Sequence, residues 1–250
     1  MQIIIHPAYR SLAPWIEALP DRFGHEGESI YKERNEIKRI RTEQIDVAVK
    51  SFRIPHLANR IAYTFFRPSK AKRSYRNAQI LLEKGIGTPH PIACIEEKTG
   101  GLLARSFYVS EHISDAGLLR ELRGQPLREV QDLAEAFAHF TAGIHRRETL
   151  HCDYSPGNIL YRKDGEQTFS FYLVDINRMR FDRPVDAPTA AFNLRKLWGK
   201  TETILFIAGI YARDRGFDEA HFKEMLLHYR HIFWSRYIRK HPGAKCLVEE

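Results

Sequence analysis

The chain has 250 residues, a length that fits one domain or two small lobes. Hydrophobic residues make up 43% and charged residues 28% of it, which excludes disordered, collagen-like and coiled-coil proteins. No apolar run approaches the roughly 20 residues of a membrane-spanning helix. The first residues do not resemble a signal peptide, and the three scattered cysteines form no disulfide framework. These features predict a cytoplasmic protein.

The net charge of +8 is concentrated in one segment. Residues 31–85 contain 14 Lys and Arg against five Asp and Glu. Such a segment suits an anionic partner, namely a nucleotide, a phosphorylated glycan or an anionic lipid surface, although a solvated basic face would look the same. We expect no nucleic acid, because zinc-finger spacing, aromatic RNA-binding motifs and a basic region with heptads are all missing.

In the first part of the chain, alternating patterns predict three antiparallel strands, at residues 29–33, 36–41 and 45–52. A helix follows, with Ser69 as its N-cap and Gly85 as its stop. Residues 92–96 and 102–109 then form a hairpin around Gly100-Gly101.

After residue 113 the pattern becomes helical. Asp115 is expected to cap a short helix that ends at residue 123, and a long helix covers 126–147. A polar loop at 151–158 leads to short strands at 159–161 and 169–174. Helices are expected at 189–198, 201–213 and 218–239. The sequence thus predicts an α+β protein whose β-rich part covers residues 1–110 and whose α-rich part covers 111–250.

Polar residues that suit phosphoryl transfer occur in a distinctive order. Lys50 ends the strand Val-Ala-Val-Lys, and an apolar strand ends at Glu111. The segment His-Cys-Asp-Tyr-Ser-Pro-Gly-Asn at 151–158 follows the long helix, and Leu-Val-Asp ends at Asp175. This order resembles the protein-kinase series of strand lysine, hinge, catalytic loop and metal-binding aspartate.

The kinase resemblance implies a role for each of these residues. Asp153 would be the catalytic base, and Lys50 would pair with the phosphates of ATP. Asn158 and Asp175 would bind Mg²⁺, whose preferred ligands are hard oxygen atoms. Main-chain groups of Glu111 and Ile113 would bond the adenine edge.

The matching segments lie within residues 45–181 and include Ser-Pro-Gly-Asn-Ile-Leu and Asp-Ile-Asn-Arg, the latter at 175–178. In them the chain resembles the bacterial lipopolysaccharide-core (Kdo/heptose) kinases. That resemblance implies a bilobal protein-kinase-like fold, with five antiparallel strands and one helix in a nucleotide-binding lobe and a mainly helical catalytic lobe. It further implies ATP-dependent phosphorylation of a sugar hydroxyl in the inner core, on an anionic glycolipid or sugar, at the inner face of the cytoplasmic membrane.

Several positions depart from the protein-kinase pattern. No glycine-rich motif lies between the first two strands, where the turn contains Arg34 and Asn35. The helix after Ser69 offers a single acid, Glu83, near its end. Ser155 replaces the lysine that is typical of protein kinases. These departures keep two alternatives open, a phosphotransferase with a small-molecule or protein acceptor and an inactive pseudokinase scaffold.

Two further surfaces attract attention. Residues 57–68 combine aromatic and cationic side chains and are a candidate for contact with lipid or acceptor. The aromatic stripe of the last helix is expected to pack on its own lobe. The oligomeric state, the acceptor hydroxyl and the need for peripheral membrane contact are left open by the sequence.

Overall fold

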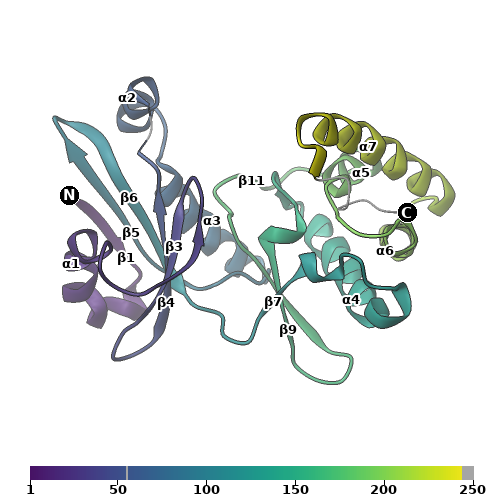
Figure 1. Cartoon of the computed structure of the whole chain (residues 1–250), viewed down its shortest axis with the longest axis horizontal. Coiled ribbons are helices and arrows are strands. Elements are labelled where there is room, and N and C mark those ends of the chain that lie inside the picture. The colour runs from purple at the N-terminus through teal and green to yellow at the C-terminus, as the bar shows by residue number, and fades with distance from the viewer. Residues whose placement is uncertain (55, 244–250) are drawn as a thin grey trace. The chain divides into compact units, whose positions relative to one another are not determined.

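The computed structural model describes residues 1–54 and 56–243, and Cys246 lies outside them. The chain divides into two compact units, Met1–Ser114 and Asp115–Glu250 (Figure 1). Cys94 and Cys152 are free thiols. Within the described ranges, no helix is both long and apolar enough to cross a membrane.

The first unit is built on an antiparallel sheet in the order β1-β5-β6-β4-β3-β2 (Figure 1). Its strands are Gln2–Ile5 (β1), Glu28–Lys32 (β2), Glu36–Arg41 (β3), Asp46–Phe52 (β4), Pro91–Thr99 (β5) and Leu102–Glu111 (β6). The five predicted strands are all present. The sixth, β1, pairs with β5 and was missed because three consecutive isoleucines show no alternation.

Helices cover both faces of this sheet. They are Ala13–Arg22 (α1), Leu57–Phe65 (α2) and Lys70–Glu83 (α3), and the short 3-10 helix Pro7–Leu12 precedes α1. The fully buried Ile16 and Leu19 of α1 join one apolar cluster with Ile95 of β5. Tyr75 of α3 and Cys94 of β5 are buried as well. Successive side chains of a strand point to opposite faces of the sheet, so Cys94 faces away from α1. Only α3 was expected from the sequence.

The expected cap of α3 is confirmed. The Ser69 hydroxyl accepts a hydrogen bond from the Lys72 amide at 3.1 Å. At the other end, Gly85 has φ of +66°, a left-handed conformation that ends helices and favours glycine.

The second unit is mainly helical. Its long helices are Leu127–Arg146 (α4), Ala187–Leu194 (α5), Thr201–Arg215 (α6) and Glu219–Lys240 (α7). Its short strands are Gly117–Leu118 (β7), Leu150–His151 (β8), Ile159–Lys163 (β9), Phe169–Leu173 (β10) and Met179–Arg180 (β11). They pair as β10-β9-β7 and as β11-β8. The α+β class predicted from the sequence is confirmed.

The helix expected after Asp115 is wrong. The segment forms β7 and a 3-10 turn at Leu119–Leu122 instead. Asp115 has φ of +56°, whereas an N-cap residue needs an extended backbone. The β7 strand forms because Gly117 and Leu118 pair with Tyr161 and Leu160 of β9, a long-range contact that local propensity does not show.

A buried histidine packs between α4 and α6. Nδ1 of His145 lies 2.7 Å from the hydroxyl of Tyr211, and both side chains are excluded from solvent. Burial is the main cause that lowers the pKa of His145 from 6.5 to about 3, and the nearby Arg215 adds to it. The imidazole is therefore neutral in the folded protein at ordinary pH.

This histidine makes the free energy of unfolding depend on pH. The unfolded chain binds a proton on His145 below about pH 6.5, and the folded chain does not, so stability is lost as the pH falls through that value. Urea unfolding at pH 6.5 and 5.5 measures how much the free energy of unfolding falls between the two pH values. This fall should be smaller by about 1 kcal/mol in His145→Gln than in the unchanged protein. Identical decreases in the two proteins would contradict a neutral His145.

Candidate active site

The loop from His151 to Asn158 is fixed at its ends and at its middle. His151 pairs with Met179 of β11, and a 3-10 turn at Pro156–Asn158 leads into β9. Tyr154 is buried, with its hydroxyl 2.8 Å from that of Thr141 and its ring stacked on Phe137 of α4. The loop is thus anchored in the helical core, while the neighbouring Asp153 side chain keeps 43% of its surface exposed.

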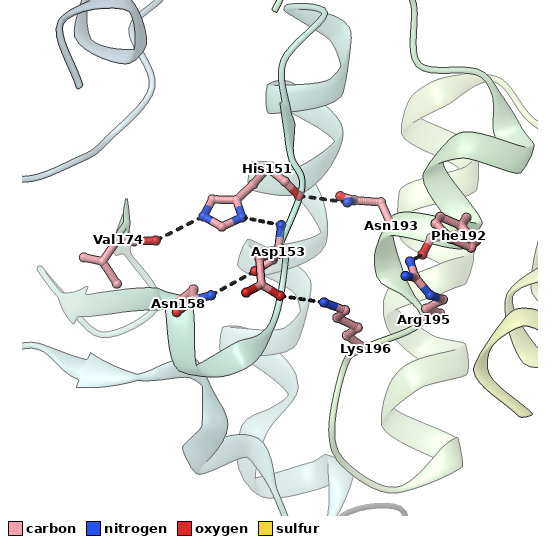
Figure 2. A network of polar contacts seen from close by, with 8 residues as sticks. All are labelled: His151, Asp153, Asn158, Val174, Phe192, Asn193, Arg195 and Lys196. Carbon is pink, nitrogen blue, oxygen red and sulfur yellow. Dashed lines mark hydrogen bonds and ion pairs between the residues drawn. The ribbon is translucent and has the colours of Figure 1, made fainter. Parts of the chain in front are cut away.

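His151 links this loop to the segment that carries Asp175. Its Nδ1 accepts a hydrogen bond from the Asp153 amide at 3.1 Å, and its Nε2 lies 3.0 Å from the Val174 carbonyl (Figure 2). An amide can only donate and a carbonyl can only accept, so the ring is neutral with its proton on Nε2. Burial lowers the pKa of His151 and favours this state. The imidazole therefore holds two backbone segments in fixed register.

Asn158 and Asp175 are brought together by the same segments. The Val174 amide donates to the Asn158 carbonyl at 3.0 Å. The Asn158 side-chain amide donates to the Asp153 carbonyl at 2.9 Å, which leaves its oxygen as the end that can act as a ligand (Figure 2). Asn177 donates to the Asp175 carboxylate at 2.6 Å, and Asp175 adopts a left-handed φ of +53°. For a residue other than glycine that backbone conformation is uncommon and is frequently found at functional sites.

These two side chains fit a magnesium ion. Mg²⁺ is usually held by one or two protein oxygens together with substrate phosphates and water. Asn158 and Asp175 offer an amide oxygen and a carboxylate. No group of three or more His, Cys, Asp or Glu that could hold a metal occurs in the part of the chain that the structure describes. A site completed by phosphates is therefore the kind that this donor set suits.

The structure adds one residue that the sequence analysis missed. The Lys196 ammonium lies 2.5 Å from the Asp153 carboxylate, and Figure 2 shows its side chain extending to Asp153 from the segment after α5. The absence of a lysine at Ser155 is a signal that a cation could come from elsewhere. No spacing rule points to Lys196, which follows Asp153 by 43 positions.

The segment around Lys196 is held from two sides. Asn193 of α5 donates to the His151 carbonyl at 2.9 Å (Figure 2). The buried Arg230 of α7 donates to the carbonyls of Leu197 and Gly199. Burial lowers the pKa of Arg230 to about 10, so the guanidinium remains charged at neutral pH. The ammonium is thus presented to Asp153 by a segment that is fixed to both the loop and α7.

The remaining candidate residues lie in the first unit. Lys50 is in β4, where it pairs with Ile37 and Tyr108, and its ammonium lies 5.4 Å from the centre of the Phe52 ring. Glu111 ends β6, and its amide donates to the His90 carbonyl at 2.9 Å. Its carboxylate accepts a hydrogen bond from the Tyr9 hydroxyl at 2.5 Å. Ile113 follows two residues after the strand.

The turn between β2 and β3 has no glycine. The Glu33 amide donates to the Asn35 carbonyl at 3.1 Å, and the side-chain oxygen of Asn35 accepts from the Arg53 amide at 3.2 Å. Asn35 thus stabilises the turn, whereas Arg34 is exposed. In α3, the single acid is the last residue, Glu83.

Comparison with known proteins identifies the family. The family model described as lipopolysaccharide kinase (Kdo/WaaP) family matches residues 27–229, which is most of the chain. The chain belongs to this lipopolysaccharide kinase family. Its members are phosphotransferases with an alcohol group as acceptor, so the chain is a kinase by family and the predicted kinase-like fold is confirmed.

Two solved structures are similar in fold. One is WaaP in complex with acyl carrier protein, with 17% identity, a TM-score of 0.62, and coverage of 92% of this chain and 98% of that one. Another, from Ralstonia eutropha, is assigned as an aminoglycoside phosphotransferase and has 12% identity, a TM-score of 0.52, and coverage of 86% and 85%. At these identities the likeness shows the fold alone. No curated protein sequence matches the chain significantly.

Replacement of Lys196 tests the ion pair with Asp153. We expect Lys196→Met to fold normally and to lower the turnover of phosphoryl transfer on the order of 100-fold, because it removes the ammonium that positions the Asp153 carboxylate. Steady-state transfer from ATP measures the effect. Lys200→Met removes a nearby lysine that follows the Leu197–Gly199 segment, and it should keep normal turnover. Unchanged or raised turnover in Lys196→Met would show that the cation is not used.

Proposed function

We propose that the chain is an ATP-dependent kinase that phosphorylates a sugar hydroxyl of the lipopolysaccharide inner core. The family match supports the lipopolysaccharide acceptor. The observation that carries the catalytic part is the His151 linkage, which holds Asp153, Asn158 and Asp175 on adjoining segments.

In the proposed reaction, Asp153 accepts the proton of the acceptor hydroxyl. The acceptor oxygen forms a bond to the γ-phosphorus of ATP while the bond between that phosphorus and the ADP oxygen breaks. Bound Mg²⁺ would neutralise charge on the phosphates, held there by Asn158 and Asp175. Lys196 lies against the carboxylate that takes the proton and adds a second positive charge.

The first unit would bind the nucleotide. Lys50 would pair with the phosphates of ATP, in keeping with its position within a central strand of the sheet. The Glu111 amide is bonded to His90, and the Glu111 carbonyl accepts a hydrogen bond from the Ser110 hydroxyl at 3.2 Å. We assign the second lone pair of that carbonyl and the main chain of Ile113 to the adenine edge. With no glycine in the β2–β3 turn, main-chain amides approach the phosphates less closely. We therefore assign phosphate binding at this turn to the exposed side chain of Arg34.

A groove beside Lys196 supports an anionic acceptor. Its volume is about 300 Å³, and its lining residues are Phe192, Arg195, Tyr229, Ile232, Phe233, Arg236, Tyr237 and Lys240. Three of these carry positive charge and none carries negative charge. Arg195 and Lys196 both lie within 6 Å of the Phe233 ring centre, so the groove adjoins the Asp153–Lys196 pair. Guanidinium groups suit carboxylates and phosphates, and aromatic rings suit the apolar faces of sugars.

Transfer of labelled phosphate from ATP tests the proposal. With Mg²⁺ and dephosphorylated lipopolysaccharide core as acceptor, the unchanged protein should label the glycolipid. Asp153→Asn should fold normally and transfer on the order of 1000-fold more slowly, because the proton acceptor is lost. Asp132→Asn, the same change at an exposed site on α4, is the matched control.

The other outcomes separate the alternatives. If the unchanged protein binds ATP and leaves the glycolipid unlabelled, the acceptor is a different small molecule or a protein. If ATP does not bind at all, the chain is a pseudokinase. Equal transfer by Asp153→Asn and the unchanged protein would refute the assignment of the base.

A further inference from the structure

Helix α2 turns its apolar side to solvent. Ten large apolar side chains are exposed in the described part of the chain, and five of them fall within residues 54–66. They are Ile54, Leu57, Ile61, Phe65 and Phe66. Phe65 and Phe66 are the most exposed of the five, at 67% and 84%. No residue of α2 is buried.

The spacing of these residues makes one stripe. Leu57, Ile61 and Phe65 follow one another at intervals of four, which places them on the same side of the helix. Phe66 extends the stripe just beyond the last turn. A stripe of this kind normally faces the interior of a globular protein.

A neighbouring line of polar residues on α2 contacts strand β6 of the sheet. Nε of Arg60 donates to the Leu103 carbonyl of β6 at 2.8 Å. The hydroxyl of Thr64 accepts from the Leu103 amide at 3.0 Å and donates to the Arg60 carbonyl at 2.6 Å. The helix is therefore attached to the sheet along the line of Arg60 and Thr64, which runs beside the exposed stripe and leaves that stripe uncovered. Its orientation is specified by these bonds, so the apolar exposure is built into the fold.

Positive charge surrounds the stripe. The exposed Arg53 precedes α2, and the exposed Arg67 follows it. A hollow of about 280 Å³ next to the helix is lined by Phe65, Phe66 and Arg67, together with Lys72, Arg76 and Lys98. Glu96 is the one acidic residue among its lining residues. Apolar side chains beside cations are the combination that binds an anionic membrane surface.

We propose that α2 is an interfacial helix that inserts Leu57, Ile61, Phe65 and Phe66 into the surface of an anionic bilayer. The flanking cations then lie at the level of the headgroups, and the hollow takes a lipid phosphate. This inference adds to the proposed function and rests on α2 and the cations around it, not on the kinase site. It would bring the protein to the membrane where a glycolipid acceptor is found.

Vesicle binding by the full chain tests this inference without any need for turnover. The probes are vesicles of phosphatidylcholine alone and of phosphatidylcholine mixed equally with phosphatidylglycerol. The unchanged protein should sediment with the anionic vesicles, and more weakly at high salt, because screening reduces the attraction of the cations. The double variant Phe65→Ser with Phe66→Ser should bind these vesicles with an affinity lower by at least about tenfold. Because both side chains are exposed, this variant should melt at the temperature of the unchanged protein.

A matched pair of isoleucines tests whether vesicle binding depends on the stripe or on any exposed apolar side chain. Ile61 is 40% exposed and Ile30, in β2, is 47% exposed. Ile61→Ser should weaken binding several-fold, and Ile30→Ser should bind as the unchanged protein does. In addition, the emission maximum of the tryptophan in Phe65→Trp should shift to shorter wavelength on anionic vesicles, because the ring leaves water.

Three results would overturn the inference. They are absence of binding to anionic vesicles, equal binding by the double serine variant, and no fluorescence shift in Phe65→Trp. Binding of the stripe to an acidic protein without any affinity for vesicles would assign it to a protein partner instead. Phosphoryl transfer to a deacylated, water-soluble core oligosaccharide should be unchanged in the double serine variant, so the failure of membrane binding and the failure of the kinase proposal are distinguishable.

Discussion

A neutral, buried imidazole determines the arrangement of the candidate active site. His151 accepts a hydrogen bond from the Asp153 amide and donates one to the Val174 carbonyl, and these bonds join the loop to the segment that ends in Asp175. A protonated ring would place an N–H against the Asp153 amide and lose the first bond. Burial prevents this by lowering the pKa of His151. The positions of Asn158 and Asp175 follow from that linkage, since the Val174 amide also bonds to the Asn158 carbonyl.

In the second unit, residues that are far apart in the sequence pair a cation with the Asp153 carboxylate. Where protein kinases carry a lysine within the loop, this chain has Ser155, and the cation beside Asp153 comes from Lys196. Lys196 is held in reach of Asp153 because Asn193 attaches α5 to the loop and Arg230 fixes the segment after Lys196. The same region supplies the basic, aromatic groove. The groove thus places positive charge next to the Asp153–Lys196 pair.

The sequence predicts the residues that depend on local order and not those that depend on tertiary contacts. The loop at 151–158 and Asp175 were singled out because the polar residues of the loop are close together in the sequence and Asp175 follows directly after an apolar strand. Lys196 and Arg230 could not, because long-range packing brings them to the loop. The short helix after Asp115 was wrong for the same reason, since pairing with β9 outweighs local capping. Strand β1 and helix α1 were missed because their patterns show no clear period, and the outward stripe of α2 appears only once the bonds of Arg60 and Thr64 are known.

The central claim is that the His151 linkage presents Asn158 and Asp175 as ligands for a metal ion bound with ATP. Calorimetric titration with a non-hydrolysable ATP analogue, with and without Mg²⁺, tests it directly. The account predicts that the unchanged protein binds the analogue more tightly with Mg²⁺ and that Asp175→Asn loses this enhancement while retaining the fold. Equal enhancement in Asp175→Asn, or no effect of Mg²⁺ on the unchanged protein, would contradict it.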